Sequence, residues 1–206
     1  MTLIFLFLFN IAWLTLLTNP AQAGCGDPAA PNVDWRRCRF NTRDLSGTNL
    51  ANAVLRDASL QQAQLAGATL TGIDAANARF VFGDLSGADL TNAILRNAEL
   101  TRAVLLGAKM QQANLNNATL YRADLRNVDL TGALLQNANL TGAVLRGAKL
   151  NRANLRSARL SRADLRETDL TGADLANADL ANAMLGGARW TDGTRICAVG
   201  SVGTCR

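Results

Sequence analysis

A large apolar residue recurs at every fifth position along most of this chain. Between Leu45 and Leu185, leucine fills 26 of the 29 such places, and the exceptions are Ala75, Phe80 and Met110. The residue two places before each of them is small, and it is nearly always alanine. A period of five matches neither the 3.6 residues of a helical turn nor the alternation of a strand. The period indicates a solenoid of short strands and corners, in which the chain turns every five residues and stacks on its own earlier coils.

Residues 20 positions apart carry related side chains, which predicts the size of one coil. One series with this spacing is mostly glycine and a second is mostly asparagine, the residues that best accept a positive φ at a tight turn. A third series alternates in charge, and opposite charges on neighbouring strands about 4.8 Å apart are weakly stabilising. The series are Gly47, Gly67, Gly87, Gly107, Asn127, Gly147, Glu167 and Gly187; Asp57, Asn77, Asn97, Asn117, Asn137, Ser157 and Asn177; and Asp89, Lys109, Asp129, Lys149, Asp169 and Arg189. They predict a coil of four pentapeptides.

The strings ADLTNAILRNAEL (88–100) and VDLTGALLQNANL (128–140) resemble those of the pentapeptide repeat proteins. The resemblance covers the chain from about Cys38 to Asp192. It implies an all-β fold, the right-handed four-sided β-helix of that family. The 31 pentapeptides centred on Phe40 to Trp190 would then make just under eight coils.

Residues 1–23 are predicted to be a secretory signal peptide, so we expect the protein to be exported to a periplasm, the extracellular space or a comparable lumen. Residues 3–18 are almost wholly apolar, and Ala21 and Ala23 supply the small side chains at the −3 and −1 positions of a cleavage site before Gly24. The first ten residues lack the Lys or Arg of a typical signal. Two alternatives stay open: an uncleaved membrane anchor, although the run is short for a span, and a lipoprotein acylated at Cys25. After cleavage, no stable membrane span is expected.

The four cysteines lie at the two ends of the predicted solenoid: Cys25, Cys38, Cys197 and Cys205. An even number in an exported chain indicates disulfides. Of three possible pairings, the nearest-neighbour one is favoured because the ends of a stiff rod stand far apart, and the sequence leaves the others open. Wide spacings and the lack of histidine argue against a zinc site. We expect no metal or cofactor.

The chain is therefore expected to comprise four segments. They are the signal peptide (1–23), an N-terminal cap (24–37), the β-helix (38–192) and a C-terminal disulfide cap (193–206). Trp35 is expected to cover the leucines of the first coil. The ending Trp-x-Asp-Gly…Cys…Cys resembles that of exported bacterial pentapeptide repeat proteins.

Two neighbouring columns of arginine form the first candidate binding surface. One contains Arg126, Arg146 and Arg166, and the corner column before it contains Arg102, Arg122 and Arg162. With a net charge of +5 on the chain, such a strip suits an acidic protein or another anionic component of the cell envelope. Asp124 and Asp164 would offset part of this charge, and a face that only aids solubility is the alternative.

The second candidate lies where the repeat is irregular, at 72–85. There Ile73 takes a small place and Ala75 a large one. Val81 and Phe82 follow at outward places, and they form a candidate contact site unless a neighbouring side chain covers them.

Several function classes conflict with the sequence. The chain has no histidine, and its period leaves no long loop to shape a pocket, which argues against an enzyme. Aromatic residues for stacking on bases are scarce, which argues against nucleic acid as a partner. Family members that interact with DNA gyrase as DNA mimics present acidic surfaces and dimerise through a C-terminal helix, unlike this basic chain with its cysteine loop.

The sequence thus predicts a non-enzymatic, exported structural or protein-interaction module. A passive spacer or assembly component of the envelope is the alternative, and neither the partner nor the oligomeric state follows from the sequence.

Overall fold

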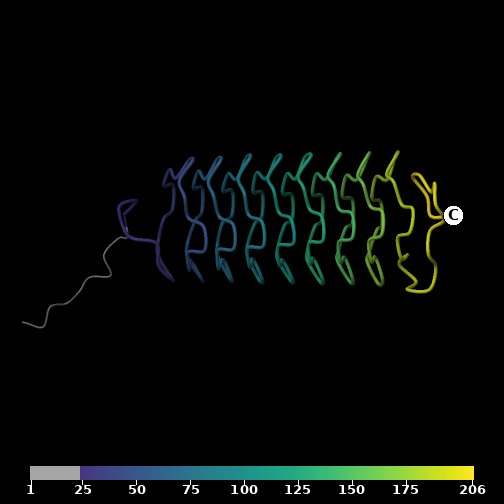
Figure 1. Cartoon of the computed structure of the whole chain (residues 1–206), viewed down its shortest axis with the longest axis horizontal. Helices are drawn as coiled ribbons and strands as arrows, with labels where there is room; N and C mark the ends of the chain where they lie inside the picture. Colours follow the sequence, from purple (N-terminus) through teal and green to yellow (C-terminus); the bar gives the residue numbers. More distant parts are fainter. Residues whose placement is uncertain (1–23) are drawn as a thin grey trace, which may run out of the picture.

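The computed structural model describes residues 24–206, which form one continuous solenoid of stacked coils (Figure 1). Each strand is reduced to a single bridging residue, and parallel bridges join residues 20 positions apart, from Asp34–Val54 to Asp169–Arg189. The coil of four pentapeptides that the residue columns predicted is therefore present. Within this described part there is no helix, and hence none long and apolar enough to cross a membrane. The predicted signal peptide at 1–23 lies outside it.

The solenoid has four sides, which we number by their bridging residues. Every twentieth residue belongs to the same side: side 1 runs from Asp34 to Asp174, side 2 from Arg39 to Asp179, side 3 from Asp44 to Met184, and side 4 from Asn49 to Arg189. Consecutive sides meet at a two-residue corner. Residues in one column therefore share one surface along the length of the solenoid.

Each pentapeptide is hydrogen-bonded to the coils on both sides of it. The amide of Asn114 donates to the carbonyl of Ala93 on the preceding coil (2.8 Å), and the amide of Leu115 donates to Leu134 on the following one (2.7 Å). The amide of Ala118 donates back to the carbonyl of Leu115 (3.0 Å) and closes the corner. Backbone groups are thus paired although the chain turns every five residues.

The second residue of a corner is left-handed, which explains the glycine and asparagine columns. Gly87 has a φ of 63° and Asn97 a φ of 58°, a region that these two residue types enter at the lowest cost. In the asparagine column, Asn97 Nδ2 donates to Asn77 Oδ1 (3.1 Å) and Asn77 Nδ2 donates to Asp57 Oδ1 (3.0 Å). Part of this column is therefore a ladder of side-chain amides.

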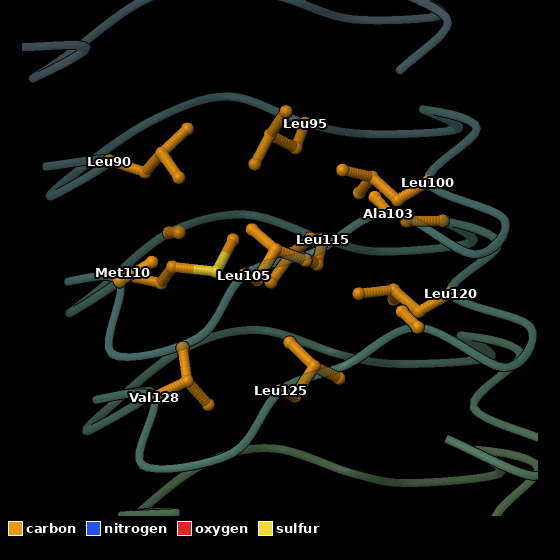
Figure 2. Packing of buried hydrophobic residues seen from close by; sticks show 14 of the residues in the cluster. Leu90, Leu95, Leu100, Ala103, Leu105, Met110, Leu115, Leu120, Leu125 and Val128 are labelled. Carbon is orange, nitrogen blue, oxygen red and sulfur yellow. The ribbon is translucent and has the colours of Figure 1, made fainter. Parts of the chain in front are cut away.

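The leucine and alanine places point inward and fill an almost wholly apolar core (Figure 2). Thr168 takes an alanine place, is buried, and donates its hydroxyl hydrogen bond to the carbonyl of Leu165 (2.7 Å). Met110 occupies a leucine place and Val128 an alanine place, and both are fully buried. At the irregular stretch, Ile73 and Ala75 are also fully buried. The exchange of a small and a large residue there keeps the core filled, as volume-conserving changes do.

At the N-terminal end, the bridging begins at Asp34, within the segment expected to be a separate cap. Trp35 takes the leucine place of the first coil and is fully buried, with its ring centroid 4.2 Å from that of Phe40. The guanidinium of Arg43 lies 5.1 Å from the centre of the Phe40 ring. Trp35 is thus part of the first coil.

Both ends carry a disulfide between nearest-neighbour cysteines. Cys25–Cys38 joins the segment before the first coil to the coil itself, and Cys197–Cys205 closes the C-terminal loop. These are the pairs that the distance between the two ends favoured.

The C-terminal segment covers only half of the last coil. Val202 pairs antiparallel with Met184 on side 3, and Ile196 pairs antiparallel with Arg189 on side 4. Leu175 and Leu180, on sides 1 and 2, are only partly buried.

Replacing a core leucine should cost far more stability than replacing an outward one. Leu115→Ala leaves a cavity in a closed core and should lower the free energy of unfolding by about 2–5 kcal/mol. Leu134→Ala, at an exposed place on side 1, should change it by less than about 1 kcal/mol. Urea denaturation of both variants measures the difference, and equal losses would contradict the arrangement of inward and outward places.

Candidate interaction surface

The structure brings both predicted arginine columns to one place, side 3 and the corner that precedes it. We call three columns together the side-3 surface. The corner column contains Phe82, Arg102, Arg122 and Arg162; the bridging column contains Val104, Asp124, Asp164 and Met184; and the column after it contains Leu106, Arg126, Arg146 and Arg166. All point away from the core because the alanine and leucine places between them point inward.

Every arginine of the third column is paired with a carboxylate. Arg126 donates two hydrogen bonds to Asp124, from Nε (2.8 Å) and Nη2 (2.6 Å). Arg166 binds Asp164 with the same two distances. Arg146 Nη2 donates to Glu167 Oε1 on the next coil (2.6 Å). This part of the strip is therefore less basic than the arginine column alone suggested.

These ion pairs lower the pKa values of the three carboxylates. Hydrogen bonds from the Arg126 side chain lower the pKa of Asp124 below its ordinary value, against the opposing effect of burial. Hydrogen bonds from Arg166 likewise lower the pKa of Asp164, whose residue is only 7% exposed. Hydrogen bonds from Arg146 lower the pKa of Glu167. All three carboxylates are therefore charged at neutral pH.

The corner arginines have no ion pair within residues 24–206. The guanidinium carbon of Arg102 lies 5.6 Å from the centre of the Phe82 ring, and that of Arg122 lies 5.2 Å from the centre of the Tyr121 ring. Both contacts are in the range of cation–π attraction. The unpaired positive charge of the side-3 surface thus lies along its corner, on Arg102, Arg122 and Arg162.

Exposed apolar side chains gather at both ends of this surface. Phe82 is 49% exposed, while Val81 beside it is partly buried. Val104 and Leu106, on the next coil, are each exposed by more than a third. The sequence thus predicted Phe82 correctly as an outward residue, and Val81 only in part.

At the other end, the C-terminal segment forms a hollow of about 430 Å³ against side 3. Met184, Val199 and Val202 supply its apolar wall, and Arg146 and Arg166 border it. Of the eight large hydrophobic residues exposed in the described chain, six lie on the side-3 surface or line this hollow: Phe82, Val104, Leu106, Met184, Val199 and Val202.

Sequence reasoning missed most of these apolar residues. Val104, Leu106 and Met184 all stand at outward places of the repeat, where polar side chains are usual. Their columns could have been searched for apolar residues once the coil of 20 was known. Val202 could not have been found this way, because it lies outside the repeat.

Phe82 stands in a strained backbone position. Its φ is 56°, and it is the only aromatic residue among the left-handed corners of the described chain. A left-handed residue other than glycine or asparagine costs about 1–2 kcal/mol, and such strain is often found at functional sites. The exposed ring therefore reduces stability at a corner where asparagine would serve.

The described residues offer no group of three or more His, Cys, Asp or Glu side chains that could hold a metal ion. The side-3 surface exposes arginine, aromatic and aliphatic groups together.

The repeats match the family model described as "Pentapeptide repeats" in 8 copies, over residues 32–81, 84–121, 123–162 and 158–189. The chain belongs to the pentapeptide repeat family. Proteins of this family fold as right-handed quadrilateral β-helices. No match was found among curated proteins.

Solved structures of the same family resemble the chain. HetL, a pentapeptide repeat protein involved in heterocyst differentiation regulation in the cyanobacterium Nostoc sp., is 32% identical over 82% of this chain and 94% of its own, with a TM-score of 0.33. A pentapeptide repeat protein of the Arabidopsis thaliana thylakoid lumen is 28% identical over 48% of this chain and 69% of its own, with a TM-score of 0.47. QnrB1, a plasmid-mediated fluoroquinolone resistance protein, is 19% identical over 73% of this chain and 86% of its own, with a TM-score of 0.42.

Acid should destabilise the protein partly through Asp164. Its pKa in the folded state lies below the value of about 3.9 expected in the unfolded chain. Its contribution is therefore complete above that value and is lost as the pH falls through the folded pKa. Urea midpoints measured from pH 6 down to pH 2.5 should fall more steeply below about pH 4 for the native protein than for Asp164→Asn. Parallel curves would contradict a stabilising Asp164–Arg166 pair.

Phe82→Asn should raise the free energy of unfolding by up to about 1 kcal/mol. Asparagine enters the left-handed region at lower cost, and the loss of the Arg102 contact offsets part of the gain. The opposite substitution at another left-handed corner, Asn97→Phe, should lower the free energy of unfolding, because it adds backbone strain and removes the hydrogen bond to Asn77. If urea denaturation finds Phe82→Asn less stable than the native protein, the ring does not cost stability.

Proposed function

We propose that this protein is an exported, non-enzymatic interaction module that docks a partner protein on its side-3 surface. The observation that carries the proposal is that six of the eight exposed large hydrophobic residues of the described chain lie on that surface or line the hollow at its end. A solenoid that serves only as a spacer has no need to collect them there. The structural and interaction roles general in the family agree with a non-enzymatic function.

The composition of the surface suits a protein interface. Aromatic residues, methionine and arginine are enriched where proteins bind one another, and a few buried apolar anchors supply most of the binding energy. Phe82 and the hollow beside Met184 are the two anchor positions, one near each end. The left-handed backbone at Phe82 supports this assignment, because half of the residue stays exposed at a corner where asparagine would be less strained.

The charges suit an acidic partner. Arg102, Arg122 and Arg162 form no ion pair with any carboxylate of residues 24–206. They can pair with acidic groups of the partner without first breaking an internal ion pair. Arg126, Arg146 and Arg166 are already paired and contribute mainly their shape and hydrogen bonds.

Export is supported by the two disulfides, which persist in oxidising compartments. A periplasm or a comparable lumen is the compartment that we propose. The partner would then itself be an exported or envelope protein with an acidic, partly apolar surface.

In-cell crosslinking followed by affinity capture tests the docking surface. The apolar variant combines Phe82→Asn with Met184→Gln. The charge variant replaces Arg102, Arg122 and Arg162 by glutamine, which other corners already hold at positive φ, as at Gln62 and Gln112. Leu134→Gln, an exposed apolar residue on side 1, is the matched control. Charge reversal at Arg126 or Arg166 is unsuitable, because it would place two carboxylates together.

We expect a partner that the native protein and the Leu134→Gln control capture equally. The apolar variant should lose it, and the charge variant should weaken it in a manner that depends on salt. Capture unchanged in both variants would reject the side-3 surface and favour the passive spacer.

A further inference from the structure

We propose that side 2 carries a binding site for a phosphate-type oxyanion near the N-terminal end of the solenoid. The site is a hollow of about 380 Å³, lined by polar side chains and separate from the side-3 surface. It spans side 2 from one corner to the next. The residues that matter for the proposal are Arg37, Arg39, Arg79, Ser59, Gln61 and Asp57.

The register of the coils brings the guanidinium groups to one hollow. Arg39, Ser59 and Arg79 bridge to one another in order and form one column. Arg39 and Arg79 therefore stand two coils apart, about 10 Å at the spacing of stacked strands, with the smaller Ser59 between them. Arg37 comes from the corner just before Arg39. The hollow forms because the short side chain of Ser59 lies between the long side chains of Arg39 and Arg79.

Two of these three arginines are free to bind. Arg79 donates to Glu99 Oε2 (2.8 Å) on the following coil. Neither Arg37 nor Arg39 takes part in an ion pair within residues 24–206. Guanidinium groups bind phosphate through paired, charge-assisted hydrogen bonds. Two unpaired guanidiniums beside one hollow therefore favour an anion there.

The rest of the lining is held in place by hydrogen bonds. Ser59 Oγ donates to Asn41 Oδ1 (2.7 Å), and the backbone amide of Gln61 donates to the same oxygen (3.1 Å). Cys38 also lines the hollow, and its disulfide to Cys25 joins this coil to the segment before it. The site thus lies on a fixed part of the solenoid.

One carboxylate limits the charge of the ligand. Asp57 lines the hollow and accepts a hydrogen bond from Asn77 Nδ2 (3.0 Å). Against the two unpaired arginines, Arg37 and Arg39, it still leaves the lining net positive, which suits a group with one or two negative charges. A free phosphate or phosphate ester and the phosphate of a lipid headgroup share this chemistry.

Titration with inorganic phosphate tests the site in the full-length protein. Arginine Nε–Hε signals are followed by NMR at an ionic strength held constant with sodium chloride. We expect saturable shifts that the double variant Arg37→Gln/Arg39→Gln weakens by at least tenfold, as the loss of charged hydrogen bonds implies. The control is Arg152→Gln/Arg159→Gln, which removes the same charge. Arg152 is a left-handed corner residue like Arg37, and Arg159 lies in the column of Arg39.

Asp57→Asn supplies a test in the opposite direction. Asparagine already occupies this column on the following coils, so the variant should fold. It should bind phosphate severalfold more tightly, because a negative charge is removed from the lining. The absence of saturable shifts in the native protein would overturn the proposal. Equal weakening of phosphate binding in the double variant and its control would also overturn it, because phosphate would then respond only to the overall positive charge of the protein.

Two further ligands distinguish the source of the anion. Glycerol 3-phosphate that competes with inorganic phosphate points to a soluble ester. Binding to vesicles that contain phosphatidic acid, lost in Arg37→Gln/Arg39→Gln but kept in its control, points to a lipid headgroup.

Discussion

The structure depends on a backbone that turns at every fifth residue and still pairs its polar groups with the coils before and after. In the coils between the first and the last, the amide of each inward leucine donates to the next coil, and the amide before it donates to the previous one. This pairing has two requirements. The second residue of each corner must adopt a left-handed backbone at low cost, and in each coil four inward leucines and four inward alanines must fill the space between the sides. The sequence repeats because every pentapeptide meets the same two demands. The outward places are left free to vary, and the side-3 surface is made entirely from them.

The ends need a different solution, since open strand edges invite association with other chains. Trp35, Phe40 and Arg43 pack against one another at the first coil. At the other end, the C-terminal segment adds antiparallel pairs to sides 3 and 4 and brings Val199 and Val202 beside Met184. The hollow on side 3 therefore exists because the chain covers its own edge there. The Cys197–Cys205 disulfide links the integrity of this cover to the proposed binding surface.

Much of the fold could be predicted from the sequence, because leucine and alanine recur at the same two positions in nearly every pentapeptide and so mark the inward places. The coil of 20 residues, the left-handed corners at glycine and asparagine, and the outward position of Phe82 all follow from position within the repeat. The start of the solenoid was placed too late, since Val33 and Trp35 stand where alanine and leucine are usual. The pairing of Arg146 with Glu167 was not predicted, because it depends on how two long side chains reach across a corner between coils. The hollow beside Met184 depends on the path of a segment outside the repeat.

The coil of four pentapeptides also constrains how such a chain can change in length. Removal of 20 residues from its middle would shorten the solenoid and leave each later column on its original side. Removal of five would keep every core contact type and every corner, yet would rotate all that follows by a quarter turn. Phe82 and the hollow beside Met184 would then face different directions, and one flat partner could no longer touch both. A protein that binds through its outer surface can therefore gain or lose length only by whole coils of 20 residues, although its fold would tolerate a change of a single pentapeptide.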